Sequence, residues 1–127
     1  MAKKSNKKLE IFQAEYLRDF YTLAFSHPKV ETLIYWSGSD LYEWRGTAAG
    51  LLDVRHEPKP AYKVLKDLIK KNWHTNVNNF TDATGAILFS GFYGEYTGTI
   101  QLNGKEQSFT FNHTPGMAAP HIIKLSY

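Results

Sequence analysis

The sequence predicts an α+β fold in which a helix–strand–helix unit is followed by a small antiparallel β module. Apolar residues recur at the helical period in the first part of the chain and alternate with polar residues in the last part. The spacing of the apolar residues changes from the helical period to alternation after Trp73. We therefore expect three parts: a disordered basic tail over residues 1–8, a β/α segment over residues 9–73, and a β module over residues 74–127.

The first predicted helix runs from Leu9 to about Ser26. His27-Pro28 ends it, because the residue before a proline is pushed out of helical geometry. One side of this helix carries apolar residues at the i, i+3, i+4, i+7 spacing, and charged residues occupy the other side. The apolar stripe consists of Leu17, Phe20, Tyr21 and Ala24.

A strand and a second helix complete the predicted β/α segment. Val30 to Trp36 ends in a continuous apolar run, which is typical of a strand covered on both faces. A loop rich in Gly, Ser and charged residues follows from Ser37 to Thr47. Pro58-Lys59-Pro60 then indicates the start of a helix, since proline is tolerated in a first helical turn. The apolar face of that helix, which extends to about Asn72, consists of Tyr62, Leu65, Leu68 and Ile69.

The β module is predicted from alternation and from turn residues. Asn103-Gly104 is typical of a type I′ hairpin turn, which requires positive φ at both of its central residues. Thr81 to Gly85 reads as a second turn. The four predicted strands are Ala86 to Phe92, Tyr96 to Leu102, Gln107 to Asn112 and His121 to Tyr127.

Composition and motifs exclude several chemistries. The chain has no cysteine, so it has no disulfide framework, and its five histidines lack metal-ligand spacing. We find no phosphate-binding glycine loop, no serine-hydrolase motif, no nucleic-acid-binding motif and no apolar run long enough to span a membrane. The net charge is only +3. We therefore predict no cofactor, no metal, no nucleic-acid or membrane partner, and no secretory signal in the chain as given.

The stretch from Leu33 to Tyr62 carries the most specific pattern. Two tryptophans eight residues apart enclose an aspartate and a tyrosine, and a Leu-Leu pair and Pro-Lys-Pro-Ala-Tyr follow. The matching residues are Trp36, Asp40, Tyr42, Trp44, Arg45, Leu51, Leu52 and residues 58–62. Together they resemble the C-terminal end of glycoside hydrolase family 10, the retaining endo-1,4-β-xylanases. The resemblance covers about residues 10–72, departs at Ser37 where the family has Gly, and extends more loosely over residues 73–96.

The resemblance implies a partial TIM-type barrel, namely its seventh helix, eighth strand and eighth helix, followed by a small sandwich-like β module. Barrel enzymes build their sites at the C-terminal ends of strands, where Trp36 would lie. Trp36 and Trp44 would then stack on sugar rings, and Arg45 would brace the loop. The expected substrate-binding residues are Trp36, Asp40, Tyr42, Trp44 and Arg45. The alternative from the residues alone is that both tryptophans are core residues under a loop.

The resemblance also implies that catalytic residues are missing. Retaining glycosidases need two carboxyl groups about 5–5.5 Å apart, and in this family both lie on barrel strands that the chain does not include. Asp40 and Glu43, at i and i+3 in the loop, are the nearest approach to such a pair. Loop carboxylates are more often solvated or hydrogen-bonded within the loop, so we predict no catalytic residue and no activity of the chain alone.

The leading prediction is therefore a C-terminal fragment of a secreted xylanase that contributes sugar-binding aromatic residues. Its partner would be xylan or a related β-1,4-linked polysaccharide. The missing barrel portion, or self-association through the unpaired strand at Val30–Trp36, would supply other contacts. Two alternatives remain: a non-catalytic carbohydrate-binding module that uses Phe92, Tyr93 or Tyr96 as a sugar platform, and a structural extension that stabilises a barrel.

Overall fold

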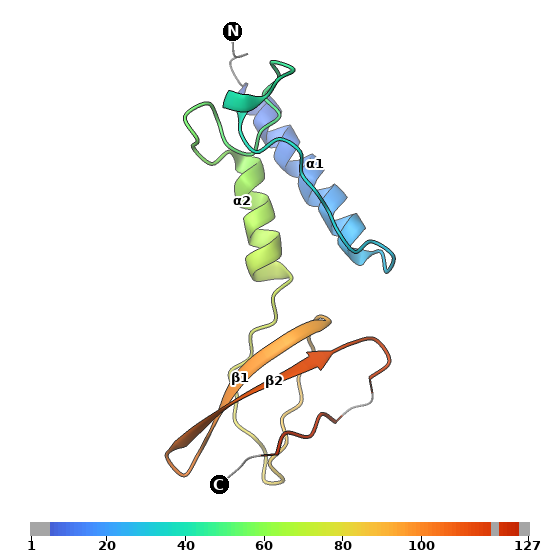
Figure 1. Ribbon diagram of the computed structural model, residues 1–127, viewed down its shortest axis with the longest axis vertical. Coiled ribbons are helices and arrows are strands. Elements are labelled where there is room, and N and C mark those ends of the chain that lie inside the picture. The colour runs from blue at the N-terminus through green and yellow to red at the C-terminus, as the bar shows by residue number, and fades with distance from the viewer. Residues whose placement is uncertain (1–5, 118–119, 125–127) are drawn as a thin grey trace. The chain divides into compact units, whose positions relative to one another are not determined.

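A computed structural model describes residues 6–117 and 120–124 of the chain (Figure 1). These residues form two α-helices and two antiparallel β-strands, joined by a short 3-10 turn and a π-helical turn. The elements are α1 (Lys7–Ser26), η1 (Asp40–Tyr42), α2 (Pro60–Asp67), η2 (Leu68–Asn72), β1 (Gly94–Leu102) and β2 (Lys105–His113). The described chain divides into two compact units, which adjoin between Trp73 and His74.

The ends of α1 follow from local capping. The Oδ1 atom of Asn6 accepts a hydrogen bond from the backbone N–H of Lys8 at 2.9 Å, which satisfies one of the free donors of the first turn. The N–H of His27 donates to the carbonyl of Ala24 at 3.1 Å where the helix ends. The predicted helix is confirmed, but it includes Lys7 and Lys8 of the predicted tail. Residues 1–5 of that tail lie outside the described part of the chain.

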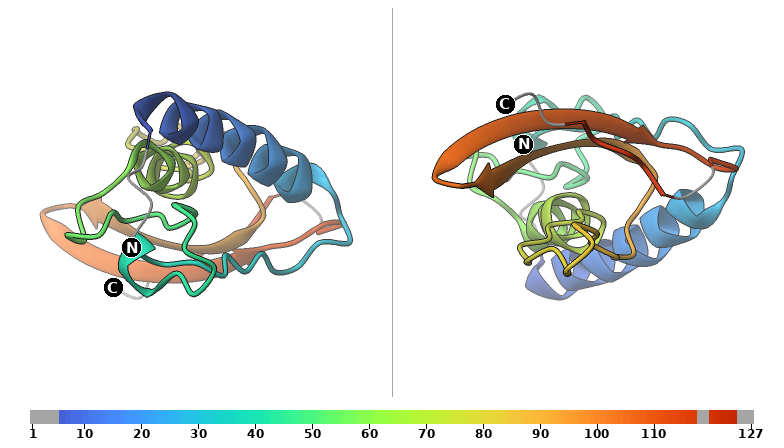
Figure 2. Two further views of the ribbon diagram at one scale, coloured as in Figure 1. Left: turned by 90° about the horizontal axis from the view of Figure 1, so that it is seen from above. Right: turned by 90° about the horizontal axis from the view of Figure 1, so that it is seen from below.

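The core of the first unit lies between α1 and α2, which run side by side (Figures 1 and 2). Ala14 and the fully buried Ala61 let the two helices approach closely, because a methyl group is the smallest apolar contact. Ala14 takes the place predicted for Phe20, whose side chain is 47% exposed. The buried cluster consists of Ala14, Leu17, Tyr21, Ala61, Leu65 and Leu68.

The predicted strand at Val30–Trp36 is not a strand. The segment is extended, but no described residue pairs with it as a neighbouring strand. Leu33 and Tyr35 pack against the helical core, whereas Ile34 and Trp36 are 84% and 85% exposed. A barrel strand needs a hydrogen-bonded neighbour on each edge. The prediction of a partial TIM-type barrel is therefore wrong, and the unpaired strand proposed for self-association is absent.

The second unit is built on one β-hairpin. Strands β1 and β2 pair in antiparallel register from Gly94 opposite His113 to Leu102 opposite Lys105 (Figure 1). Asn103 and Gly104 have φ angles of 51° and 77°, so the predicted type I′ turn is confirmed. The strands predicted at Tyr96–Leu102 and Gln107–Asn112 are also confirmed, with slightly longer bounds.

The predicted sandwich-like module is wrong. Residues 86–92 and 121–124 are not strands, and residues 125–127 of the last predicted strand lie outside the described residues. Aromatic rings, and not a second sheet, cover the hairpin: Tyr96 stacks on Phe111 with centroids 5.1 Å apart, and His121 packs on Phe111 at 4.8 Å. The fold among the described residues is therefore α+β, with a helix pair and one two-stranded sheet. No helix in this part of the chain has the length and hydropathy of a bilayer-spanning segment.

Candidate binding site

Three exposed aromatic side chains lie on one loop of the first unit. We call residues 36–46 the aromatic loop; its Trp36, Tyr42 and Trp44 are 85%, 76% and 74% exposed. They border an open hollow of about 430 Å³. The residues around it are Trp36, Ser37, Gly38, Ser39, Tyr42, Glu43, Trp44, Leu52 and His56. The alternative that both tryptophans are core residues is therefore wrong.

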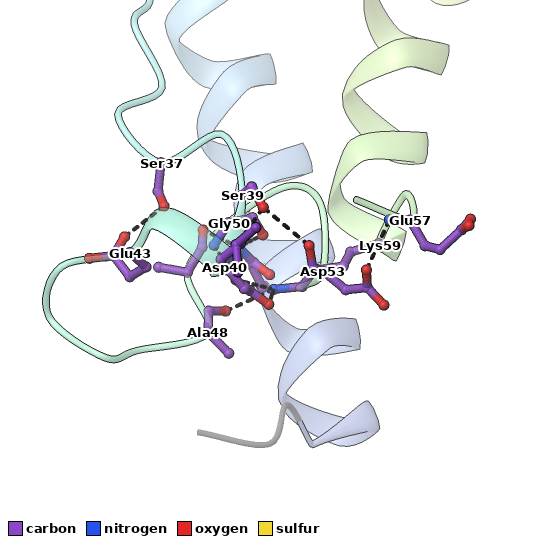
Figure 3. A network of polar contacts seen from close by, with 12 residues as sticks. Ser37, Ser39, Asp40, Glu43, Ala48, Gly50, Asp53, Glu57 and Lys59 are labelled. Carbon is purple, nitrogen blue, oxygen red and sulfur yellow. Dashed lines mark hydrogen bonds and ion pairs between the residues drawn. The ribbon is translucent and has the colours of Figure 1, made fainter. Parts of the chain in front are cut away.

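A buried ion pair holds the base of the aromatic loop (Figure 3). The Nζ atom of Lys59 lies 3.1 Å from Oδ2 of Asp40, and the two side chains are only 2% and 6% exposed. Lys59 also donates to the carbonyl of Ala48 at 2.8 Å, and Asp40 accepts from the N–H of Gly50 at 2.7 Å. Buried charges are tolerated when they are paired and hydrogen-bonded in this way. Asp40 thus joins three segments and does not border the hollow.

Backbone contacts fix the segment that returns from the aromatic loop to α2. The N–H of Asp40 donates to the carbonyl of Leu52 at 2.9 Å, and the N–H of Leu52 donates to Gly38 at 3.1 Å. Asp53 accepts from the N–H groups of Glu57 and Arg55 at 2.9 and 2.7 Å (Figure 3). The hydrogen bond from Glu57 is the main reason that the pKa of Asp53 is lowered.

Helix α1 contacts the segments that flank the aromatic loop. The side-chain amide of Gln13 donates to the hydroxyl of Tyr35 at 3.0 Å and to the carbonyl of Ala49 at 2.9 Å. Tyr35 donates to the same carbonyl at 2.6 Å, and burial raises its pKa. Sequence reasoning did not single out Gln13 or Lys59 as parts of the site. A charged residue between two prolines was the signal that could have marked Lys59.

Ser37, Glu43 and Arg45 stabilise the exposed end of the loop. The hydroxyl of Ser37 donates to Oε2 of Glu43 at 2.6 Å, and Glu43 also accepts from the N–H of Arg45 at 3.3 Å. The guanidinium of Arg45 lies 4.9 Å from the centroid of the Trp44 ring, a cation–π distance. Asp40 and Glu43 therefore each have hydrogen-bond partners of their own.

Removing the Ser37 hydroxyl is expected to raise the pKa of Glu43. That pKa lies below its ordinary value, chiefly because of the hydrogen bond from Ser37 and then because of the bond from Arg45. These hydrogen bonds to the Glu43 carboxylate stabilise the folded chain at pH values above the pKa that Glu43 has in the unfolded chain. The stabilisation is lost as pH falls through the lowered pKa of Glu43 in the folded chain. NMR titration of the Glu43 carboxyl carbon should show its pKa move toward the ordinary value in Ser37→Ala and remain unchanged in Ser26→Ala. Equal pKa values in both variants would contradict this account.

Two of the aromatic residues predicted as a sugar platform in the second unit, Tyr93 and Tyr96, make ring contacts within that unit. The Tyr96 hydroxyl donates to the carbonyl of Phe92 at 2.7 Å, and its ring is stacked on Phe111. Tyr93 lies against His113, with ring centroids 4.9 Å apart. These rings stabilise the hairpin instead of forming a separate flat surface. Among the described residues, no group of three or more His, Asp or Glu side chains could hold a metal ion.

Comparison with known proteins finds a similarity to part of one anti-sigma factor. No protein-family model matches the chain. It is similar to the anti-sigma-I factor RsgI6 of Acetivibrio thermocellus, with 32% identity over 108 residues. The match covers 84% of this chain and 14% of the relative, so the chain spans only a small part of that protein's length.

This similarity corrects the prediction made from the tryptophan and proline motifs. The similar protein is named as an anti-sigma factor, so the predicted xylanase fragment, its xylan-degrading role and its polysaccharide partner are wrong. The carbohydrate-binding alternative is not supported either. The motif has a structural explanation instead: Asp40 and Lys59 form the buried pair, and Leu52 bridges to Ser39.

Proposed function

We propose that the chain is a non-catalytic, protein-binding segment of a regulatory protein, and that the aromatic loop is its binding surface. The observation that carries the proposal is the set of three aromatic side chains, 74–85% exposed, on a loop held by a buried ion pair. Trp, Tyr and Arg are the residue types most enriched among the energetically dominant residues of protein interfaces. Trp36, Tyr42, Trp44 and Arg45 bring all three types to one surface.

The loop is suited to binding because its backbone is already ordered. Association costs free energy for every segment that must become fixed, and a loop held in place beforehand avoids most of that cost. Lys59, Gln13 and Asp53 each tie the loop or its return segment to the unit. The aromatic side chains add contact area with only two rotatable bonds each, so their own loss of freedom is small.

The partner proposed is a sigma factor, because the chain is similar to an anti-sigma-I factor. Its surface would need apolar pockets for the two indole rings and a carboxylate or carbonyl group for Arg45. A guanidinium stacked on Trp44 at 4.9 Å is oriented for such a contact while its charge stays near water.

Replacing Trp44 with alanine is expected to weaken binding to a sigma-I factor by about 30-fold, as for other central aromatic residues of interfaces. Isothermal titration calorimetry with the full chain and a purified sigma-I factor measures this change. Phe80→Ala is the matched control, because Phe80 is 94% exposed but lies in the second unit. It should bind as the unchanged chain does.

Three results would count against the proposal. The first is no measurable binding of the folded chain to the sigma factor at about 100 µM. The second is equal affinity of Trp44→Ala and Phe80→Ala. The third is saturable binding of a xylo-oligosaccharide that is lost in Trp44→Ala, since that would make the aromatic loop a sugar site.

A further inference from the structure

Helix α1 carries a second apolar stripe that no described residue of the first unit covers. Its members are spaced by three, four, four and three positions, which places them on one side of a helix with 3.6 residues per turn. They are Leu9, Phe12, Tyr16, Phe20 and Leu23, with exposures of 65%, 65%, 59%, 47% and 71%. The side that packs on α2 is a different one, formed by Ala14, Leu17, Tyr21 and Ala24.

Two neighbouring members of the stripe pack on each other. The rings of Tyr16 and Phe20 are nearly parallel, at 7°, with centroids 6.2 Å apart. Single exposed apolar residues need no explanation, but a contiguous apolar patch along a helix marks an interaction site. A helix in water usually has one apolar face, whereas α1 has two.

The order of residues along the stripe is symmetric about Tyr16. Phe12 and Phe20 lie four positions before and after it, and Leu9 and Leu23 lie seven positions before and after it. A second copy laid antiparallel across Tyr16 would therefore place Phe12 opposite Phe20 and Leu9 opposite Leu23. Such self-complementarity is what a two-fold symmetric interface requires, because each contact then occurs twice.

We propose that α1 pairs antiparallel with α1 of a second copy of this chain, with the two-fold axis at Tyr16. The stripe is about 21 Å long at 1.5 Å per residue, so the helices must cross at a small angle of about 20° to stay in contact along it. The five side chains offer on the order of 600 Å² per copy, or about 1,200 Å² per pair, the lower limit of specific interfaces. The dimer is accordingly a weak one. It uses no residue of the aromatic loop and is independent of the proposed function.

Analytical ultracentrifugation of the full chain tests the pairing. Tyr16→Lys puts two like charges on the axis and should raise the dimer dissociation constant by at least about 30-fold. Ile11→Lys is the matched control, because Ile11 is an apolar residue of α1 that is 48% exposed outside the stripe. It should dimerise as the unchanged chain does, and far-UV circular dichroism should show equal helix content in both variants.

Cysteine cross-linking tests the register without depending on a destabilising charge. The chain has no cysteine of its own. Tyr16→Cys should form a disulfide with its own copy, whereas Leu9→Cys should cross-link only when mixed with Leu23→Cys. Efficient self-cross-linking of Leu9→Cys would show parallel pairing and overturn the proposal. A folded chain that stays monomeric at about 100 µM, or equal behaviour of Tyr16→Lys and Ile11→Lys, would overturn it as well.

Discussion

Replacing Lys59 with methionine is expected to lower the free energy of unfolding of the first unit by about 3–5 kcal/mol. Methionine keeps most of the apolar stem of lysine but removes its charge. Asp40, with a side chain that is 6% exposed, would then be a buried carboxylate without its partner at 3.1 Å. The carbonyl of Ala48 would lose its hydrogen bond at the same time. Urea unfolding followed by far-UV circular dichroism measures the difference.

Two further variants separate charge from packing in that experiment. Lys63→Met makes the same change at an exposed position of α2 and should shift stability by less than about 0.5 kcal/mol. Asp40→Asn added to Lys59→Met should restore at least about 1 kcal/mol, because asparagine can still accept from Gly50 and carries no charge to leave unpaired. If Lys59→Met alone lowered the free energy of unfolding by less than about 1 kcal/mol, the Lys59–Asp40 ion pair would contribute no more to stability than a surface ion pair does.

Replacing Gly50 with alanine is expected to destabilise the first unit by about 1–3 kcal/mol and to shift the aromatic loop. A Cβ at this position would collide with the backbone N of Asp40 and come within 2.8 Å of its Oδ1 atom. Backbone cannot rotate away as a flexible side chain can, so the segment that holds the loop must move. Under the proposed function, binding to a sigma factor should weaken together with stability, and calorimetry and urea unfolding report the two effects separately.

Gly38→Ala is the matched control for Gly50→Ala. It lies in the aromatic loop itself, yet a Cβ there would meet nothing within 4 Å. Its unfolding free energy should stay within about 0.5 kcal/mol of that of the unchanged chain. If both glycine variants were equally stable, the close approach of Gly50 to the Ser39–Asp40 backbone would not be a constraint on the fold.

The parts of the fold that short-range patterns govern were predictable. A proline after His27 ends α1, and Pro60 begins α2, because each acts on the backbone of its immediate neighbours. Asn103-Gly104 specifies its hairpin turn for the same reason. The residues alone left open whether Trp36 and Trp44 are buried under the loop, and only the structure shows that both are exposed.

The prediction for Val30–Trp36 shows where local pattern becomes insufficient. A continuous apolar run is compatible with a strand buried on both faces, and it is equally compatible with an extended segment that packs on one side only. Whether the run becomes a buried strand or an extended segment depends on whether neighbouring strands are present. The residues within the run do not encode those neighbours. The resemblance implied a barrel around it, and residues 6–117 and 120–124 contain only one two-stranded sheet.

The amino-acid sequence by itself determined the two helices and the hairpin with its turn, because each depends on residues within a few positions of one another. Tertiary structure alone decided that Asp40 pairs with Lys59, nineteen positions away, and that Phe20 stays exposed while Ala14 is buried. Burial and ion pairing depend on which surfaces meet in space. The sequence of a helix with two apolar sides does not predict which of the two sides the rest of the chain will bury.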